Sequence, residues 1–220
     1  YLEDRLRMFS NLANASGFYG KMIYFGTGAE YGRHIPLDCV REEEIGRCVP
    51  RDTYGLCMYE ENELARASDN IYNLRLFGIF GQGEHWESRF ISNAICKALC
   101  GYPITVRQNR IMDFLYIDDL CRIAEWAVAS DTLHHDYNAV SGVPHSLIGL
   151  AEEVRQVTNA DVPILVANEG DGLVYTADNQ RLLLEMPEFA PEPIGRSIEK
   201  LADYYRRNLS TISREALLYP

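Results

Sequence analysis

The stretch Ile23-Tyr24-Phe25-Gly26-Thr27-Gly28-Ala29-Glu30-Tyr31-Gly32 indicates how this chain folds. An apolar run enters a turn of small residues, and the hydroxyl of Thr27 lies within that turn. A short apolar run bounded by glycines is typical of a buried strand. A second run, Asn73-Leu74-Arg75-Leu76-Phe77-Gly78-Ile79-Phe80-Gly81, predicts another buried strand that ends in glycines.

Between these runs lies Tyr54-Gly55-Leu56-Cys57-Met58. Together the three stretches resemble the extended short-chain dehydrogenase/reductase family, the NAD(P)-dependent epimerases and dehydratases of nucleotide sugars. That family has Ser or Thr four residues before a Tyr-Gly pair, followed later by Tyr-x-x-x-Lys. Thr27 matches the first pattern through Tyr31-Gly32, and Tyr54 matches the tyrosine of the second. The lysine position is occupied by Met58.

The resemblance implies catalytic roles for Thr27, Tyr54 and the Met58 position. Tyr54 would exchange a proton with a substrate oxygen to which the Thr27 hydroxyl donates. A phenol has an ordinary pKa of about 10, so this tyrosine needs a nearby cation to work near neutral pH. Residues i and i+4 share one face of a helix, which is how the family's lysine reaches the tyrosine and the cofactor ribose. A thioether supplies neither charge nor donor.

The resemblance also implies NAD or NADP as the cofactor, with Tyr54, Leu76 and Phe77 beside the nicotinamide. In the family, a glycine-rich first turn holds the pyrophosphate. No G-x-G-x-x-G pattern occurs in this sequence, which opens within an amphipathic helical pattern. The comparison with the family therefore predicts an N-terminally truncated sequence that lacks a first half of about 75–90 residues. This piece alone is expected to bind NAD weakly or not at all.

Substrate recognition departs from the family pattern at two positions. Gly78 stands where the family usually has an asparagine that contacts the sugar or diphosphate. Met112 stands where the family often has an arginine that binds the diphosphate. Arg89, Arg107 and Arg110 are nearby in sequence. Each either neutralises a diphosphate instead, as a guanidinium can, or is an ordinary solvated charge.

The pattern along the chain predicts an α/β fold, namely a partial Rossmann-type doubly wound parallel sheet with a smaller C-terminal substrate-binding portion. Residues 1–138 are assigned to the C-terminal part of a dinucleotide-binding domain, with a substrate-side segment at 82–113, and residues 139–220 to the substrate-binding portion. The predicted strands are 22–25, 71–77, 104–106, one around Tyr137-Asn138, and 163–166. The predicted helices are 54–67, 87–99, one running to about 129, 146–157, 178–185 and 193–207, with a loop at 34–52.

The stretch Met112-Asp113-Phe114-Leu115-Tyr116-Ile117-Asp118-Asp119 resembles a second family box, in which a strand feeds the next helix. Asp118 or Asp119 is expected to cap that helix rather than to take part in catalysis or to bind a metal. The five histidines have no spacing that suggests a metal site.

Composition limits the function classes. The net charge of −11 argues against nonspecific nucleic-acid binding, which needs a positive field. No apolar run is long enough to span a membrane, and no signal peptide is visible. The six cysteines show no C-x-x-C spacing, which fits a reducing, cytoplasmic compartment. The expected partner is a nucleotide sugar, and a homodimer stays open.

Two functions remain open from the sequence. The first is an NAD(P)-dependent epimerase, dehydratase or 4-keto-sugar reductase that transfers hydride at a sugar carbon, with Tyr54 as acid/base. The second is a catalytically inactive member of the same fold that binds cofactor or a protein partner as a sensor or scaffold. Met58, Gly78 and Met112 favour the second, whereas Thr27 and Tyr54 favour the first. Met58 as an altered residue in an otherwise active enzyme is a third reading that the sequence leaves open.

Overall fold

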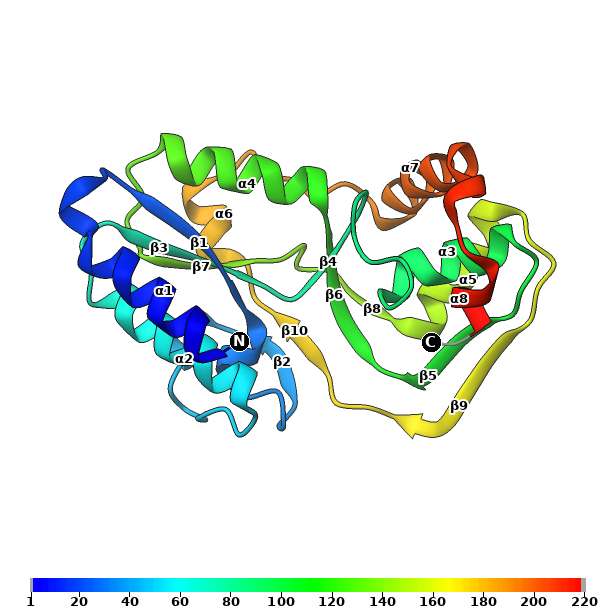
Figure 1. Cartoon of the computed structure of the whole chain (residues 1–220), viewed down its shortest axis with the longest axis horizontal. Helices are drawn as coiled ribbons and strands as arrows, with labels where there is room; N and C mark the ends of the chain where they lie inside the picture. Colours follow the sequence, from blue (N-terminus) through cyan, green and yellow to red (C-terminus); the bar gives the residue numbers. More distant parts are fainter. Residues whose placement is uncertain (1, 219–220) are drawn as a thin grey trace.

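The structure is a computed structural model that describes residues 2–218, and it has two lobes joined by strands that cross between them (Figure 1). The first lobe contains a parallel sheet of strand order β1-β3-β7 with helices on both faces. This arrangement confirms the predicted Rossmann-like α/β class. The elements of this lobe are α1 (Leu2–Asn14), β1 (Met22–Thr27), α2 (Thr53–Arg66), β3 (Ile71–Leu76), α4 (Ile117–Ala129), β7 (Asp136–Ala139) and α6 (Gln180–Glu185).

Two apolar clusters hold the helices to the faces of this sheet. Helices α1 and α2 pack on one face, where Phe9 and Ala65 meet Tyr24 and Ile71. Helices α4 and α6 pack on the other, in a cluster that contains Leu74, Leu115, Leu120, Ile123, Tyr137 and Leu182. Each face buries the apolar residues that the strand pattern places on it, as expected for a sheet covered on both sides.

Register brings the functional ends of the strands to one edge of the sheet. Thr27 at the end of β1 lies opposite Leu76 at the end of β3, and Leu76 lies opposite Ala139 at the end of β7. All three strands are parallel, so their carboxyl ends meet at this edge. In open α/β sheets this is the edge at which ligands bind.

The second lobe is built mainly of helices around its own core. That core includes Ile91, Ile95, Leu150, Ile198 and Leu201, all at most 1% exposed. A parallel ribbon of β5 with β9 lies along one side and pairs with no other strand in the described part of the chain. The elements of this lobe are α3 (Phe90–Leu99), β5 (Ile104–Asn109), α5 (Leu147–Thr158), β9 (Ile164–Asp171), α7 (Ile194–Arg207) and α8 (Arg214–Leu218).

A third sheet connects the lobes, with strand order β2-β10-β6-β4 and β8 antiparallel to β6. Its strands are β2 (Leu37–Val40), β4 (Gly78–Phe80), β6 (Ile111–Tyr116), β8 (Pro144–Ser146) and β10 (Tyr175–Ala177). Four 3-10 turns complete the described elements, η1 (Ser16–Phe18), η2 (Gly28–Tyr31), η3 (Glu42–Glu44) and η4 (Leu209–Thr211). Because β10 returns the chain to the first lobe before α6, the two lobes are not separate stretches of sequence.

Several predicted boundaries are wrong. The segment 34–52 contains strand β2 and turn η3 rather than loop alone, and strand β10 was not predicted. The predicted helix at 87–99 begins at Phe90, and the strand predicted at 163–166 runs on to Asp171. The predicted helix at 178–185 begins at Gln180.

The predicted caps have mixed outcomes. Ser146 caps α5 by accepting a hydrogen bond from the Gly149 amide at 3.0 Å, as its place before an apolar periodic stretch suggests. Asp118 and Asp119 lie in the first turn of α4 and do not cap it, because Tyr116 is its N-cap residue and makes no side-chain bond there. Asp119 instead accepts from the Glu192 amide at 2.9 Å and from Arg122. It holds the segment before α7 against α4.

The helices described in residues 2–218 are all too short or too polar to cross a membrane.

Candidate functional site

Thr27 is held in place by the turn that follows it. Its backbone amide donates to the Glu30 carboxylate at 2.8 Å, and its hydroxyl oxygen accepts from the Ala29 amide at 3.3 Å. These two bonds form a capping box at the start of η2. Gly32 ends the turn with φ +84°, a backbone conformation that favours glycine. The small-residue turn seen in the sequence therefore fixes Thr27 at the edge of the sheet.

Tyr54 lies in the first turn of α2 and is 40% exposed. The N-cap residue of this helix is Asp52, which accepts from the Gly55 amide at 2.9 Å. Asp52 also pairs with Arg33 at 2.9 Å, and the Arg33 guanidinium lies 5.6 Å from the centre of the Tyr54 ring. The phenol is thus accessible, with a cation against its ring.

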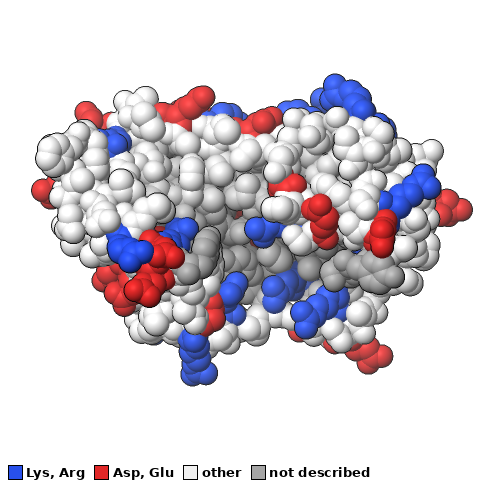
Figure 2. Space-filling model, in the orientation of Figure 1, with Lys and Arg blue, Asp and Glu red and all other residues white. Residues whose placement is uncertain are grey.

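Thr27 and Tyr54 line one cleft of about 730 Å³ between the lobes. Figure 2 shows the surface hollowed there, with basic side chains around the opening. The structure thus brings seven of the sequence-predicted site residues to one cavity, although they come from five segments of the chain. These seven are Thr27, Tyr54, Leu76, Phe77, Arg89, Arg110 and Met112.

Met58 does not line the cleft. It follows Tyr54 by one helical turn, but its side chain is 1% exposed and buried within the first lobe. Methionine fills irregular gaps in cores well, which suits this environment. The position at which the resembled family has lysine therefore supplies no cation here. Arg33 is the described cation that contacts the Tyr54 ring.

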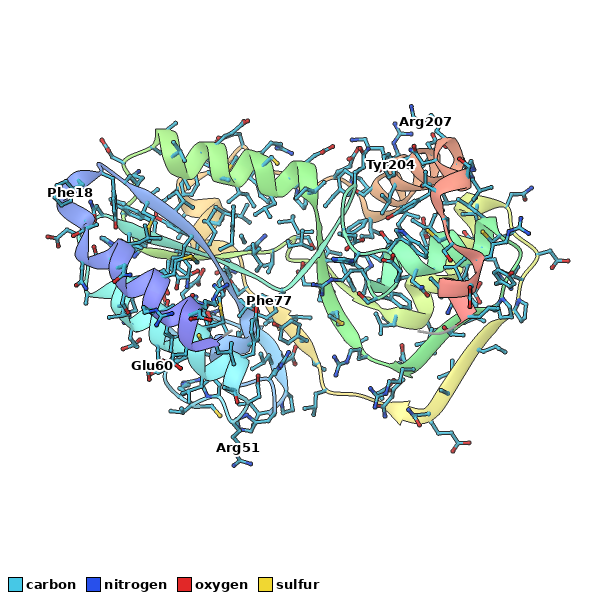
Figure 3. The ribbon with its side chains drawn as sticks, in the orientation of Figure 1. Phe18, Arg51, Glu60, Phe77, Tyr204 and Arg207 are labelled. Carbon is cyan, nitrogen blue, oxygen red and sulfur yellow. The ribbon has the colours of Figure 1, made fainter. Side chains whose placement is uncertain are left out.

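Leu76 and Phe77 form an apolar wall of the cleft at the end of β3. Figure 3 shows Phe77 near the middle of the molecule, between the lobes. Its ring centre lies 4.6 Å from that of Tyr175 on β10. A Cβ atom added to Gly28 would lie 2.6 Å from the Phe77 ring, so the turn after Thr27 requires glycine at this contact.

Gly78 lies beside the cleft rather than in it, in an adjoining cavity of about 240 Å³. It pairs with Phe114 in the β4–β6 register, and an added Cβ would lie 2.5 Å from the carbonyl oxygen of Asp113. No side chain fits there without a shift of the backbone. Strand β6 thus lies too close to this position for the asparagine side chain that the family has there.

The arginines have different positions. Arg89 and Arg110 line the cleft and also the adjoining cavity, together with Met112. Arg107 lies on β5, outside the cleft lining. It lines a separate cavity of about 990 Å³, which it shares with Arg110. Arg110 therefore connects the cleft to the larger cavity of the second lobe.

Three further cleft residues with polar side chains were not predicted from the sequence, namely Arg33, Glu84 and Tyr175. Burial raises the pKa of Tyr175 to about 12, although its hydrogen bond with Thr27 and the charge of Arg33 oppose the rise. Arg33 directly follows Gly32, whose backbone is left-handed. This glycine was the one local signal in the sequence that could have identified Arg33 as a cleft residue.

A buried polar network lies beneath the cleft. Arg75 is fully buried and donates to Glu30 at 2.7 Å, to Asp136 at 3.1 Å and to Asn62 at 2.9 Å. Burial opposes its charge, but Glu30, Tyr31 and Asp136 outweigh burial and raise the pKa of Arg75 further. The network links η2, β3, α2 and β7 under the site and keeps Glu30, which holds Thr27, in position.

Asp113 fixes the junction between the lobes. It is 1% exposed and accepts from the Ser141 amide and hydroxyl at 2.9 and 2.8 Å and from the Gly142 amide at 2.8 Å. Burial raises its pKa to about 6, against the effect of these bonds. In residues 2–218 no group of three or more His, Cys, Asp or Glu side chains is placed to hold a metal ion.

Comparison with known proteins agrees with this geometry. The model of the NAD dependent epimerase/dehydratase family matches residues 1–139. A GDP-L-fucose synthetase from Naegleria fowleri has a similar structure, with a TM-score of 0.79 and 16% identity over 94% of this chain and 73% of its own. A dTDP-glucose 4,6-dehydratase from Bacillus anthracis gives 0.77 and 16% over 92% and 67%. A UDP-glucuronic acid 4-epimerase from Bacillus cereus gives 0.77 and 19% over the same shares. No curated protein sequence matches this chain.

Proposed function

Because the chain belongs to the NAD dependent epimerase/dehydratase family, we propose that its cleft binds a nicotinamide cofactor and a nucleotide sugar for hydride transfer at a sugar carbon. The reaction would be that of an epimerase, a dehydratase or a 4-keto-sugar reductase. The observation that carries this proposal is the shared cleft of Thr27 and Tyr54, which reach it from the end of β1 and the start of α2.

Thr27 and Tyr54 would act on the same sugar oxygen. The Thr27 oxygen accepts from the Ala29 amide, and its hydroxyl also bonds Tyr175, so a substrate oxygen would take the place of Tyr175 as acceptor of the Thr27 proton. The exposed Tyr54 phenol would exchange the proton of that oxygen as general acid or base. Arg33, close to the Tyr54 ring, adds positive charge on this side of the cleft.

The cleft wall suits the nicotinamide end of NAD or NADP. Leu76, Phe77 and Ile79 present an apolar surface at the strand ends, next to the Tyr54 phenol. When bound, the cofactor supplies the hydride donor or acceptor. The missing glycine-rich pattern leads to the prediction that residues 1–220 alone hold NAD weakly, which calorimetry would test; tight NADH binding would contradict it.

The buried Met58 specifically favours a second candidate function. Without the family's cation at that position, the protein would bind cofactor and nucleotide sugar as a sensor or scaffold and turn nothing over. Both candidates predict ligand binding in the cleft, so only turnover separates them.

The test measures turnover of a panel of UDP-, GDP- and dTDP-sugars with NAD and NADP. Tyr54→Phe should lower turnover by about 10²–10⁴-fold while ligand binding stays, since the phenyl ring keeps its place. Met58→Lys should raise turnover where a rate exists, at some cost in stability because the new ammonium is buried. Met8→Lys on the exposed face of α1 is the matched control, since Met8 is 61% exposed. Binding of both cofactor and nucleotide sugar with no turnover of any sugar in either background would establish the binding function instead.

A further inference from the structure

Glu84 is the acidic residue among the described side chains that line the main cleft. It lies between β4 and α3 and faces the main cleft and the adjoining cavity. Three guanidinium groups line the same cleft, those of Arg33, Arg89 and Arg110. A single carboxylate among cations in a ligand cavity is a strong chemical selector, because it attracts donors and repels anions.

The Glu84 carboxylate is held by a chain of hydroxyl groups. The Ser92 hydroxyl donates to its Oε1 oxygen, and the Tyr205 hydroxyl on α7 donates to Ser92 at 3.0 Å. Ser92 and Tyr205 are 0% and 3% exposed, so the chain is anchored in the core of the second lobe. A carboxylate has about four acceptor positions, which leaves capacity for a ligand. The group is therefore positioned before any ligand arrives.

The environment of Glu84 favours a partner that donates hydrogen bonds. Burial raises its pKa, although Ser92, the Gly81 amide and Arg89 oppose the rise. An ionised carboxylate that has lost hydration gains from hydroxyl or ammonium donors and is penalised by a second carboxylate close by. Arg89 and Arg110, in contrast, suit the diphosphate of a nucleotide sugar.

We propose that Glu84 is a specificity-determining residue that selects nucleotide sugars whose ring offers hydroxyl or amino donors and excludes nucleotide uronates. This inference rests on the proposed function of the cleft. The substrate is then a neutral or amino sugar linked to a nucleoside diphosphate. The arginines hold the diphosphate, and Glu84 faces the ring.

The test compares equilibrium affinities for UDP, UDP-glucose, UDP-glucosamine and UDP-glucuronate by calorimetry at pH 8, with GDP as a second nucleotide. The wild-type protein should bind UDP-glucose and UDP-glucosamine at least tenfold more tightly than UDP-glucuronate. Glu84→Gln should reduce this ratio to about one, because the amide keeps the shape and removes the charge. Glu84→Asp, which keeps the charge, should retain the discrimination against the uronate.

Two controls separate this role from a structural one. Glu87→Gln removes a charge from the same segment but outside the cleft lining, and it should leave the ratio unchanged. The melting temperature of Glu84→Gln should match that of the wild type, and any change in UDP affinity should apply equally to the three sugars and cancel from the ratio. Equal wild-type affinity for the three sugars, or an unchanged ratio in Glu84→Gln, would overturn the inference and leave the proposed function intact. If neither UDP nor GDP binds, the proposed function of the cleft fails and the inference fails with it.

Discussion

Beneath the cleft, Arg75 forms ion pairs with Glu30 and Asp136, both within 3.1 Å. At the rim of the cleft, in contrast, Arg89 and Arg110 form no ion pair within residues 2–218. Arg75 is fully buried and Arg89 is exposed. A buried charge must be paired to be tolerated, so the Arg75 network belongs to the fold. A hydrated, unpaired arginine at a cavity costs little and remains available for an anionic ligand. The comparison separates charges that build the first lobe from charges that can bind.

The largest expected effect comes from breaking the buried side of this comparison. Arg75→Met would leave Glu30 and Asp136 buried without their cation, and it should lower the free energy of unfolding by about 3–5 kcal/mol. Urea denaturation measures the change. Arg66→Met is the matched control, because Arg66 is exposed and its contact with Glu63 is 3.5 Å long. That variant should change stability by less than about 1 kcal/mol. Similar losses in the two variants would contradict the distinction.

Asp113 allows a second test, on a buried carboxyl group that is held by hydrogen bonds from backbone amides rather than by a cation. Between about pH 3.8 and pH 6 the folded state keeps the Asp113 proton while the unfolded state releases it. The Asp113 contribution to the free energy of unfolding should therefore be fully present below pH 3.8 and fall by about 3 kcal/mol as pH rises through 6.

The measurement is the pH dependence of denaturation of the wild type minus that of Asp113→Asn, which cannot titrate. The difference should slope downward in this window. Asp161→Asn removes an exposed carboxylate of the second lobe and should preserve the wild-type slope. Parallel curves for the wild type and Asp113→Asn would show that burial does not hold the proton.

Gly78 tests how tightly the strand next to the cleft is packed. Gly78→Ala places a methyl group 2.5 Å from the Asp113 carbonyl oxygen, so β4 or β6 must move. Overpacking of this kind costs about 1–3 kcal/mol. Gly20→Ala is the control, since an added Cβ there meets nothing within 4 Å. Equal melting temperatures for the two variants would show that the strands yield easily.

The parts of this molecule that the sequence predicted are those carried by local patterns. The apolar run into the Thr27 turn, the start of α2 next to Tyr54 and the Ser146 cap depend on neighbours within a few residues. Strand β10 has no such signal, because its three residues pair with β2 and β6, which are distant in the sequence. Tyr175 was missed for this reason.

Tertiary contacts also overruled one local expectation. An aspartate at a helix start is a good cap, yet Asp119 binds the Glu192 amide instead. Glu84 and Arg33 are polar residues in irregular segments, where no periodic sequence pattern predicts which way a side chain faces. The resemblance to the family could therefore predict that Thr27 and Tyr54 share a cleft, but it could not supply the charges around them.

The smallest expected effect concerns the unpaired side of the comparison. Arg110→Gln removes a guanidinium that lines both the cleft and the larger cavity, and it should weaken UDP binding by about 1 kcal/mol, or about fivefold. The effect should shrink as salt rises, because salt screens a charge that is open to solvent in a cleft. Titration calorimetry at low and high salt measures both. Arg196→Gln on α7 removes an exposed arginine that pairs with Glu199, and it should leave UDP affinity unchanged. If Arg110→Gln binds UDP as the wild type does at low salt, the rim arginines are solvated surface charges and the contrast with Arg75 is one of burial alone.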